Sequence, residues 1–593
     1  MGFRVTCPGG HIAGLNSATF CLGFLFALNC PLAIADDWDW EWVVSAEADA
    51  VTRCVATDDD GNLYVVGSFR NEFVLDSVVL TSVNLTSDAF LLKLTPNGQA
   101  IWGRSAGGER LDRYWGVTWD PSGYVYIAGD FCSNTITFDT ITLENNFQSP
   151  YHDVSSFDVF TACYTEGGNI VWVQKAGGLW DDHTTGIASD AEGNIYTLGT
   201  FFSSEIIFDT VSLTNSGNID MFLASYDTDG HIRYARNAQG AGQENAWSLA
   251  IDSVGMVYIV GSFRSPTLVF DSQVLMNTSD DFDLYVTKLS PTGRFLWARS
   301  AVGQEWDDAK TLAIDKNDNV YVAGNFRSDT LSFQTTKLIL SGSARPNIDM
   351  FLVRFDGEGD ISWAVSSAGA AWPYPSAACI WSAEQIAIIG TFTGCNFGDT
   401  EHFGANSITS HGSYDIFLTD YDVTGNSVAA ENFGGDDMDF GQAICADSND
   451  NLSMGAYFDS DSLTIGTVTL VNEHNNKMLV AKRSNSNVTQ VTDGRREARP
   501  PACPIFLIST PNPFNTRTQI AYELNLTEQV WLGVFDLSGR LIRNLVDGIQ
   551  VQGPHAIIWD GRDFRDTEVA TGVYLFRLRT ENGVGVAKTV LVK

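Results

Sequence analysis

Basic residues are scarce in this sequence, and the shortage is confined to one part of the chain. There are 35 Lys and Arg residues against 72 Asp and Glu residues, a formal net charge of −37 at pH 7. Residues 36–482 hold 21 basic and 61 acidic residues, a net charge of −40, whereas residues 505–593 hold nine of each. Such a charge repels phosphate backbones and anionic membrane surfaces, so nucleic acid is not expected as a partner. Cations, cationic ligands or simple solubility remain as interpretations.

Long hydrophobic runs are missing after the N-terminus, so no transmembrane segment is expected in the mature chain. The first residues differ, because Arg4 is followed by an apolar stretch at 20–35 that ends in Ala-Ile-Ala. A basic residue, an apolar stretch too short for a membrane span and a small-x-small ending are typical of a signal peptide. We therefore expect residues 1–35 to be a signal peptide, cleaved near Ala35.

Cysteine patterns that bind metals or carry out redox chemistry are also missing. Seven cysteines follow the predicted cleavage site, without a CxxC pair or a zinc-type Cys and His spacing. Export would allow disulfides, but the sequence shows no regular pairing. Cys54, Cys379 and Cys445 fall in corresponding segments of an internal repeat, which is typical of small core residues. No cofactor is evident, and Ca²⁺ is the one metal ion that the acidic residues leave open.

Catalytic motifs are equally hard to find. The eight His residues include no HExxH pair, and the G-x-S-x-G match at 103–107 lies at a strand end, outside the strand–turn–helix context of a nucleophile elbow. Two strings that resemble calcium loops, at 58–61 and 227–230, lack the remaining ligands and fit hairpin turns. His183, which follows two aspartates, is the most suggestive histidine.

What the sequence has instead is a long internal repeat. A phrase of the form G-N-x-Y-x-x-G-x-F recurs along the chain, and its internal glycines are 62 to 70 residues apart. These glycines mark seven copies: Gly67, Gly129, Gly199, Gly261, Gly324, Gly390 and Gly455. Each copy contains short alternating strands joined by turns of Asp, Asn, Gly and Ser, which are typical of antiparallel hairpins. Four strands per copy and no helical periodicity predict a seven-bladed β-propeller.

The repeat also resembles a known family. The phrases D-x-x-G-N-x-Y-V-x-G-x-F and D-x-F-L-x-x-Y-x-x-x-G-x-x-x-W are similar to the bacterial seven-bladed β-propeller repeat, over residues 36–482. Copy seven departs from it, because the chain turns polar after residues 477–483 and no fourth strand follows. Copy six has Ala429 in the fourth strand, where the other copies have Trp102, Trp172, Tyr234, Trp297 and Trp363.

The segment WVVSA at 42–46 looks like the fourth strand of a repeat that lacks its first three strands. A propeller must close its ring, because an unpaired strand edge promotes aggregation. We therefore expect residues 42–46 to pair with residues 477–483 and to complete the last blade. Trp42 would then take the place of Trp102 in its own blade.

The C-terminal part of the chain has a different pattern. Residues 483–504 are polar and then Pro-rich, which predicts a linker. Residues 505–593 show apolar runs with turns every 8 to 12 residues, which predicts a small Ig-like β-sandwich. The motifs PNPF (511–514), WDG-x-D (559–563) and VATGVYLFRL (569–578) resemble the type A sorting domain of type IX secretion and the related flagellar hook-capping Ig-like domain. The expected fold is therefore all-β, a seven-bladed β-propeller followed by a small β-sandwich.

The resemblance of the C-terminal domain implies that the protein is exported cargo. It implies the type IX secretion machinery and its sortase as partners, and a place outside the cell or on the outer surface of a diderm bacterium. Removal of the domain in exchange for a surface anchor stays open. The expected oligomeric state is a monomer.

One set of acidic residues shares a position in the repeat, at the start of the innermost predicted strand. A propeller places these residues in a ring around one mouth of its central channel. Convergent carboxylates would attract Ca²⁺ or a cationic ligand. Alternatively, each acid binds backbone N–H groups of an adjacent loop and locks neighbouring blades together, a structural role favoured by its recurrence in most copies. The set is Asp49 (offset by one), Asp112, Asp182, Glu244, Asp307 and Asp439, with Pro373 in copy six.

The function expected from the sequence is that of a secreted binding or scaffold module for a glycan or protein ligand. An extracellular propeller enzyme, a polysaccharide lyase or hydrolase, is the alternative, and a structural adhesion or surface-layer component is a third possibility. An enzyme would show an asymmetric cluster of acid, base and arginine at one mouth of the channel. The sequence shows near-symmetric turns, so an enzyme is not favoured. A site-specific pocket is expected near the deviating segments 149–158 and 371–377.

Overall fold

The computed structural model describes residues 40–147, 156–342, 347–382, 385–394, 398–473, 475–484, 507–524, 527–536, 541–563, 567–580 and 583–592. Every regular element within these residues is a strand, except one 3₁₀ turn at Val83–Leu85. The chain divides into two compact units, Met1–Val488 and Thr489–Lys593. The expected signal peptide and most of the expected linker lie outside the described residues.

The first unit contains seven antiparallel sheets with four main strands each. The innermost strands are β2 (Glu47–Thr57), β7 (Asp112–Trp119), β13 (Asp182–Ser189), β20 (Glu244–Ile251), β26 (Asp307–Ile314), β33 (Ala371–Trp381) and β39 (Asp439–Ala446). The second strands are β3 (Leu63–Leu75), β8 (Tyr124–Phe131), β14 (Ile195–Phe201), β21 (Val257–Phe263), β27 (Val320–Phe326), β34 (Gln385–Gly394) and β40 (Leu452–Phe458). The third strands are β5 (Ser87–Leu94), β11 (Asp158–Thr165), β17 (Asp220–Tyr226), β24 (Asp283–Leu289), β30 (Asp349–Phe355), β37 (Asp415–Asp422) and β43 (Lys477–Arg483). The fourth strands are β6 (Ala100–Gly107), β12 (Ile170–Gly177), β18 (Ile232–Asn237), β25 (Phe295–Ser300), β31 (Ile361–Ser366), β38 (Ser427–Phe433) and β1 (Trp40–Val44).

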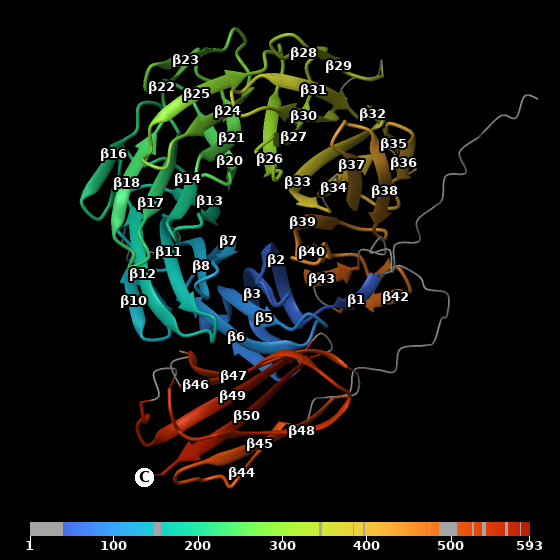
Figure 1. Ribbon diagram of the computed structural model, residues 1–593. Coiled ribbons are helices and arrows are strands. Elements are labelled where there is room, and N and C mark those ends of the chain that lie inside the picture. The colour runs from blue at the N-terminus through green and yellow to red at the C-terminus, as the bar shows by residue number, and fades with distance from the viewer. Residues whose placement is uncertain are drawn as a thin grey trace, which may run out of the picture. The chain divides into compact units, whose positions relative to one another are not determined.

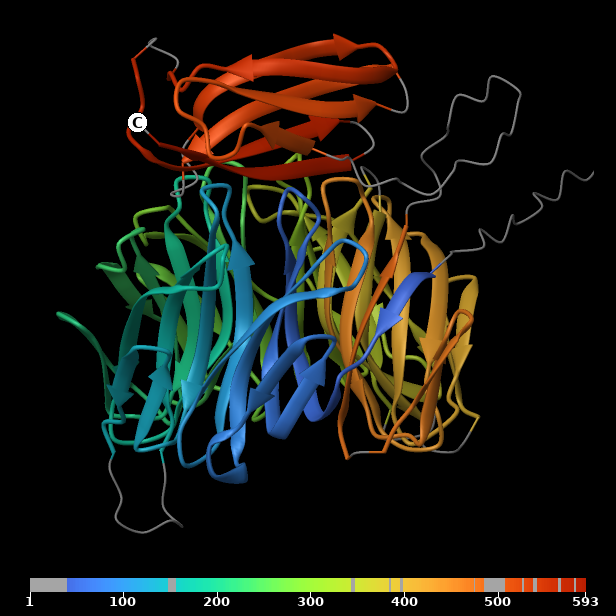
Figure 2. The same ribbon diagram turned by 90° about the horizontal axis from the view of Figure 1, so that it is seen from below.

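The seven innermost strands contact one another in cyclic order, from β2 to β39 and back to β2. Figure 1 shows the sheets arranged around this circle, and Figure 2 shows the same strands from the side. An all-β chain of small antiparallel sheets in this order is consistent with the blades of a β-propeller. Because each sheet packs against a neighbour on both faces, the second and third strands are almost completely buried.

Short outer hairpins cover the free edges of several sheets. β9 (Thr135–Phe138) pairs with β6 of the preceding sheet, and β15 (Glu205–Phe208) pairs with β12 in the same way. Their partner strands are β10 (Ile141–Glu144) and β16 (Val211–Thr214). The F-D-x-x-x-L segments of the sequence form these hairpins, and their pairing hides backbone groups that would otherwise be exposed at an edge.

The recurrent glycine of the repeat has a packing cause. A Cβ atom on Gly67 would lie 1.9 Å from the carbonyl oxygen of Val51 in the adjacent strand, so only glycine fits. The equivalent glycines of the next five copies meet a carbonyl oxygen at 1.9 to 2.2 Å. Copy seven is the exception, because Phe458 is in register with Asp439 and the residue in the glycine position is therefore Ala456, one position after Gly455.

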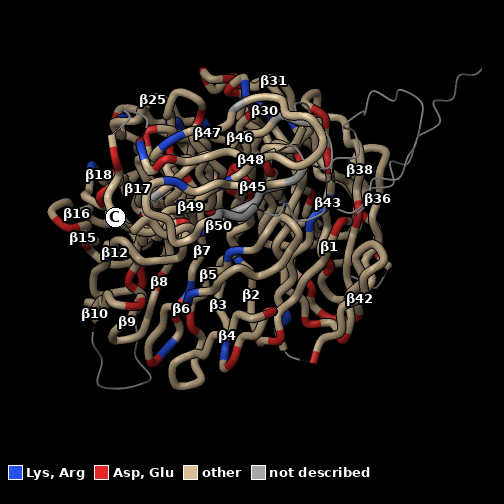
Figure 3. Tube along the Cα trace, turned by 60° about the horizontal axis from the view of Figure 1, so that its bottom comes forward, with Lys and Arg blue, Asp and Glu red and all other residues tan. Residues whose placement is uncertain are grey.

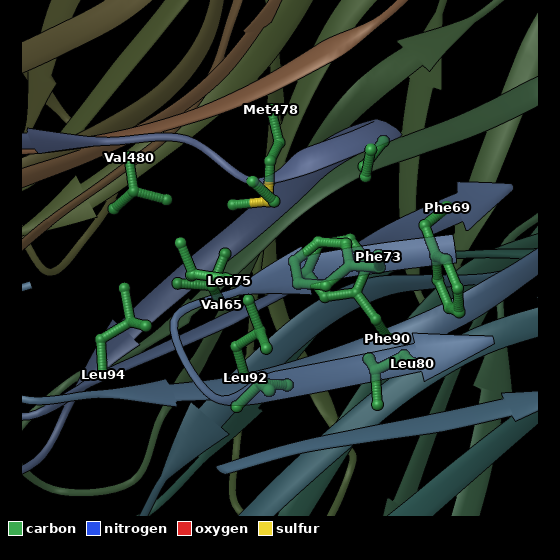
Figure 4. Close-up of a cluster of buried hydrophobic side chains, with 14 of the residues drawn as sticks. Val65, Phe69, Phe73, Leu75, Leu80, Phe90, Leu92, Leu94, Met478 and Val480 are labelled. Carbon is green, nitrogen blue, oxygen red and sulfur yellow. The ribbon is translucent and has the colours of Figure 1, made fainter. Parts of the chain in front are cut away.

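The N-terminal strand lies on the last repeat. In β1, Trp42 pairs with Lys482 and Val44 pairs with Val480 of β43. The strand begins at Trp40 and ends at Val44, so it is shifted by two residues towards the N-terminus from the expected segment 42–46. Met478 and Val480 of β43 also belong to the hydrophobic cluster of the first repeat, together with Val65 and Phe73 (Figure 4). The first and last repeats therefore share one core.

The fourth-strand aromatic residues connect each sheet to the next. The indole Nε1 of Trp42 donates a hydrogen bond to the carbonyl oxygen of Pro96 at 2.9 Å, and its ring covers Gly98, which has a φ of +80°. The same contact joins Trp102 to Glu166, Trp172 to Thr228, Trp297 to Gly357 and Trp363 to Val423. Each aromatic residue thus seals the turn between the third and fourth strands of the following repeat.

This arrangement explains the departure at Ala429. The repeat after it has no turn between its third and fourth strands, because β1 supplies the fourth strand from the other end of the sequence. A fourth-strand tryptophan at position 429 would have nothing to cover. The junction is held instead by Arg483, which is fully buried and lies 2.6 Å from Asp420 and 3.1 Å from Glu431. Trp40 adds an edge-to-face contact with Phe433 at 5.5 Å.

The second unit is built from two antiparallel sheets. One contains β44 (Leu507–Thr510), β45 (Thr518–Leu524) and β48 (Gly553–Trp559); the other contains β47 (Leu541–Gln550), β46 (Glu528–Asp536), β49 (Gly572–Thr580) and β50 (Gly583–Leu591). Their inner faces meet in one hydrophobic cluster that includes Ile520, Leu532, Trp559 and Phe576. No helix of the described residues is long and apolar enough to cross a membrane.

Candidate ligand-binding site at the channel mouth

The predicted acid ring lies at the starts of the innermost strands, and five of its members accept a hydrogen bond from a serine of their own repeat. Asp112, at the start of β7, is fully buried and accepts a hydrogen bond from the Ser133 hydroxyl at 2.8 Å. The pairs Asp182–Ser203, Asp307–Ser328 and Asp439–Ser460 repeat this contact at 3.0, 2.7 and 2.8 Å, and Glu244 accepts from Ser265. Within the described part of the chain, no group of three or more His, Cys, Asp and Glu side chains could hold a metal ion.

Asp49 does not occupy the same place as the others. Ala50 is the residue in register with Phe69, as Asp112 is with Phe131, so Ala50 stands at the ring position of the first repeat. Asp49 is half-buried and accepts a hydrogen bond from the Asn476 side chain at 3.2 Å.

Each ring acid has a second buried acid beside it, at the start of the third strand of the preceding sheet. Burial, with the nearby Asp88 adding to the effect, raises the pKa of Asp112 to about 8. Burial also raises the pKa of Glu244 to about 8, where it is hydrogen-bonded to Asp220. The remaining pairs are Asp158–Asp182, Asp283–Asp307 and Asp415–Asp439. In copy six, Glu401 lies beside Asp349 and supplies the acid that Pro373 lacks.

Next to the ring, the side chains of the innermost strands form an asymmetric cluster. Asp130, in the second strand β8, is fully buried. Its carboxylate accepts hydrogen bonds from Arg113 Nε at 2.9 Å and from Trp115 Nε1 at 2.9 Å, and it lies 2.9 Å from His183 Nδ1. The Arg113 guanidinium also lies 4.6 Å from the centroid of the Phe157 ring. Acid, imidazole and guanidinium therefore meet at one point, an asymmetry that the near-symmetric turns of the sequence do not show.

His183, the histidine noted in the sequence, is held in this cluster. Its ring stacks at a tilt on Phe157, with centroids 4.9 Å apart, and its side chain is 30% exposed. With Nδ1 directed to Asp130, Nε2 is left to accept a proton or to bind a ligand. A carboxylate-oriented imidazole beside a guanidinium has the residue types of general acid–base catalysis as well as those of polar ligand recognition.

A second cluster of the same kind lies in the fourth and fifth sheets. Lys310 Nζ is 2.9 Å from Asp308 and 3.7 Å from the centroid of the Trp247 ring. The Trp247 indole donates a hydrogen bond to Asp308 at 3.3 Å. Trp306 flanks Lys310 on another side, at 5.6 Å. Cation, acid and tryptophan thus recur, but without the histidine.

Between these clusters lies a cavity of about 220 Å³. All seven innermost strands contribute to its lining, and its polar residues include Arg53, Thr185, Ser248, Thr311 and Gln442. In the loop before β13, Leu179 and Trp180 are 65% and 67% exposed. Exposed large apolar side chains are typical of an interaction surface.

The sequence did not identify Asp130 or Arg113 as site residues. It singled out His183 but did not reveal that Asp130 is its partner. A signal was present at the variable position of G-x-F, within an otherwise constant phrase. The copies have Ser68, Asp130, Thr200, Ser262, Asn325, Thr391 and Tyr457 there. The only charged residue in this set is Asp130. The deviating segment 149–158 lies outside the described residues except for its last three, and one of those three is Phe157.

Comparison with known proteins gives distant similarities. No family model matches the chain. It is 23% identical over 371 residues to the uncharacterized WD repeat-containing protein L264 of Acanthamoeba polyphaga mimivirus, covering 52% of this chain and 27% of that protein. It is 31% identical over 115 residues to the regulatory protein FlaEY of Caulobacter vibrioides, covering 19% and 12%. The chain thus spans about a quarter or less of the length of these relatives.

Among solved structures, the similarities are low in score. The acylaminoacyl peptidase of Pyrococcus horikoshii is 8% identical with a TM-score of 0.32, covering 80% of this chain and 57% of that one. PorZ, a surface component of the type IX secretion system of Porphyromonas gingivalis, is 11% identical with a TM-score of 0.16, covering 93% and 100%.

Proposed function

We propose that the protein is a secreted or cell-surface binding module, a seven-bladed β-propeller that takes its ligand at the channel mouth. The second unit, an Ig-like sandwich, would direct export through the type IX secretion machinery. Support for the propeller comes from seven sheets whose innermost strands contact one another in a circle. Support for export comes from the motifs at 511–514, 559–563 and 569–578 and from the signal-like residues 1–35.

The asymmetry of the mouth carries the proposal. A purely structural ring would repeat the same side chains in each sheet, as the acid–serine contacts do. The mouth does not repeat, because Asp130 gathers Arg113, Trp115 and His183 in one sector. Most Asp and Glu residues of the first unit are spread along its strands and turns, whereas basic residues are few (Figure 3). Three of those few cations, Arg53, Arg113 and Lys310, lie at or near the channel.

An extracellular enzyme is the second candidate. The acid, imidazole and guanidinium around Asp130 meet the expectation for an active centre better than the turns of the sequence do. In this role His183 would move the proton, and Arg113 would bind the negative charge that develops on a substrate.

A glycan and cation binding screen on the full chain tests the proposal. The informative variant is Asp130→Thr, which installs the residue of the next repeat, and Ser262→Ala at the same position of the fourth sheet is its control. We expect Asp130→Thr to lower the melting temperature, because Arg113 loses its buried carboxylate, and to abolish binding at a temperature where the variant is still folded. Ser262→Ala should bind normally. Normal binding by Asp130→Thr would refute the mouth as the site.

The acid ring and the enzymatic alternative need separate measurements. A variant with Asn at positions 112, 182 and 307 separates the two roles of the ring. Binding lost from a chain that melts normally supports a cation site. A lower melting temperature at pH 5, where replacing a protonated acid brings no electrostatic gain, supports the structural role. For the enzyme, a bound polysaccharide is incubated with the protein and its length is followed by size-exclusion chromatography. Shortening that His183→Gln abolishes would establish catalysis.

A further inference from the structure

Arg53, in the innermost strand β2, forms no ion pair within 4 Å among the described residues. Its only hydrogen bond among the described residues runs from Nη1 to the Gln442 side chain at 3.2 Å. The guanidinium carbon lies 4.6 Å from the centroid of the Trp115 ring and 5.9 Å from that of Tyr457. Burial lowers the pKa of this guanidinium, as expected for a charge removed from water.

The nearest acid does not balance this charge. Asp130 is close enough to affect Arg53, but its oxygens already accept from Arg113, Trp115 and His183. Arg53 and Arg113 both lie within 5 Å of the Trp115 ring, at 4.6 and 4.9 Å. Two guanidinium groups thus share one carboxylate, which leaves one positive charge uncompensated in an otherwise acidic unit.

The Nε–Nη2 edge of the Arg53 guanidinium has no hydrogen-bond partner among the described residues. Nη1 is used by Gln442, and Nε is buried without any hydrogen-bond partner. The Nε and Nη2 groups form the edge through which arginine binds a carboxylate with two parallel hydrogen bonds. Because a buried donor without a partner is costly, a small rotation of the Arg53 side chain that brings Nε and Nη2 against a ligand oxygen would remove an existing penalty.

The cavity that Arg53 lines limits the size and chemistry of the ligand. Its volume of about 220 Å³ is below the range of roughly 300–1,000 Å³ of drug-sized sites, so one small unit fits. Hydroxyl and amide side chains line it, at Thr185, Ser248, Thr311, Ser376 and Gln442, and the Thr185 hydroxyl is buried without a partner. Trp115 and Trp247 add apolar ring edges. Hydroxyl groups, an apolar face and a carboxylate occur together in a sugar acid.

We infer that the channel binds the carboxylate of a sugar acid, a hexuronate-type unit, through the Nε–Nη2 edge of Arg53. The net charge of the first unit repels polyanions, so the ligand is a single acidic sugar on an otherwise neutral chain. This inference rests on the proposed binding function and specifies its ligand class.

The test is a calorimetric titration of the full chain with sodium D-glucuronate, D-glucose and N-acetylaspartate. We expect D-glucuronate to bind, and D-glucose to bind at least about tenfold more weakly because it lacks the charged group. N-Acetylaspartate distinguishes an acidic amino acid from a sugar acid. Equal binding of N-acetylaspartate and D-glucuronate would overturn the assignment to a sugar, and equal binding of D-glucose would overturn the role of the carboxylate.

Variants assign the effect to the guanidinium. Arg53→Gln should weaken D-glucuronate binding by at least about tenfold, and Arg53→Lys should restore part of it, because lysine keeps the charge without the two-pronged edge. Arg294→Gln, at an exposed turn, is the control and should bind like the parent. Circular dichroism melting checks that each variant is folded. If Arg53→Gln does not fold, the binding measured for Arg53→Lys is the test of the inference. Unchanged binding by a folded Arg53 variant refutes the inference.

The two proposals fail in distinguishable ways. If D-glucuronate does not bind but a ligand from the screen is lost in Asp130→Thr, the mouth is the site and the sugar-acid inference is wrong. If the screen also yields no ligand that depends on Asp130, both proposals are wrong.

Discussion

The Trp42 indole donates a hydrogen bond to the Pro96 carbonyl oxygen at 2.9 Å, across 54 residues of sequence. Trp42 belongs to β1, the strand that completes the last repeat, and Pro96 belongs to a turn of the first repeat. This contact therefore joins the two ends of the repeat array, as the same contact joins Trp102 to Glu166 within it. Any force that opens the ring at this junction must separate both β1 from β43 and Trp42 from its turn.

Replacing Trp42 by alanine should destabilise the first unit strongly. The change removes the cover of Gly98, the hydrogen bond to Pro96 and packing against the shared core. Truncation of a fully buried tryptophan costs about 3–5 kcal/mol, so the half-buried Trp42 should cost up to that amount. Deletion of residues 36–48 should cost more, because it exposes the edge of β43. Thermal melts followed by near-ultraviolet circular dichroism measure both effects. Trp180→Ala is the control, since that side chain is 67% exposed; a Trp42→Ala melt that matches it would contradict closure by β1.

Arg483, the last residue of β43, should contribute as much to the stability of the first unit as Trp42 does, through its contacts with the sixth repeat. Replacing it by alanine leaves Asp420 buried without its cation, and breaking a buried ion pair costs about 3–5 kcal/mol. The double variant Arg483→Met and Asp420→Leu should recover much of that loss, because no uncompensated charge then remains at Asp420. Urea unfolding of the single and double variants measures the difference. A double variant as unstable as Arg483→Ala would show that packing, and not charge, dominates at this junction.

The strand content of the repeat could be predicted because its cause is local. The glycine of G-x-F marks a close strand contact, the Asp and Gly turns mark hairpins, and a surplus WVVSA segment marks a missing strand. Ala429 could be noticed but not explained, because its explanation depends on which turn a tryptophan covers in the following repeat. That relationship is a contact between repeats and appears only when the sheets are placed side by side.

The candidate site could be predicted only in part. The ring acids were found because they recur, and the structure adds the contacts of five of them with Ser133 and its equivalents. The mouth cluster was missed because Arg113, Asp130 and His183 come from three strands of two repeats and share no sequence motif. Glu401 was missed for a similar reason, since it belongs to an outer hairpin strand, Thr400–Phe403, and reaches Asp349 through the fold.

Glu401, which supplies the acid that copy six lacks at Pro373, provides a single-residue test of the buried pairs. Burial raises the pKa of Glu401 to about 9, with the charge of Asp349 adding to the effect. Replacing Glu401 by glutamine removes the need to keep a proton there, so the variant should melt at a higher temperature than the parent at pH 8 and close to it at pH 5. Glu192→Gln, at an exposed turn, is the control. An equal effect of Glu401→Gln at both pH values would show that Glu401 is not protonated in the folded chain.

The six buried pairs together predict that the first unit is most stable in mild acid. Burial raises the pKa of Asp112 and Glu244 to about 8 and that of Asp182 and Asp307 to about 7, whereas unfolded carboxyl groups titrate near 4. A raised pKa means that the folded chain binds more protons than the unfolded chain between about pH 4 and pH 8. The stability from these groups is therefore complete below pH 4 and is lost as the pH rises through 7 and 8.

At lower pH, carboxyl groups whose pKa is lowered in the folded chain determine how stability changes. Hydrogen bonds to its carboxylate lower the pKa of Asp447 against the effect of burial, so its contribution is present above pH 4 and is lost on further acidification. The melting temperature should thus pass through a maximum near pH 5 and fall towards pH 9. Melting curves in matched buffers at constant ionic strength measure this profile. Asp112→Asn should flatten the alkaline side, because its pair with Asp88 then needs no shared proton, and a profile that rises from pH 5 to pH 9 would contradict protonated pairs at the sheet junctions.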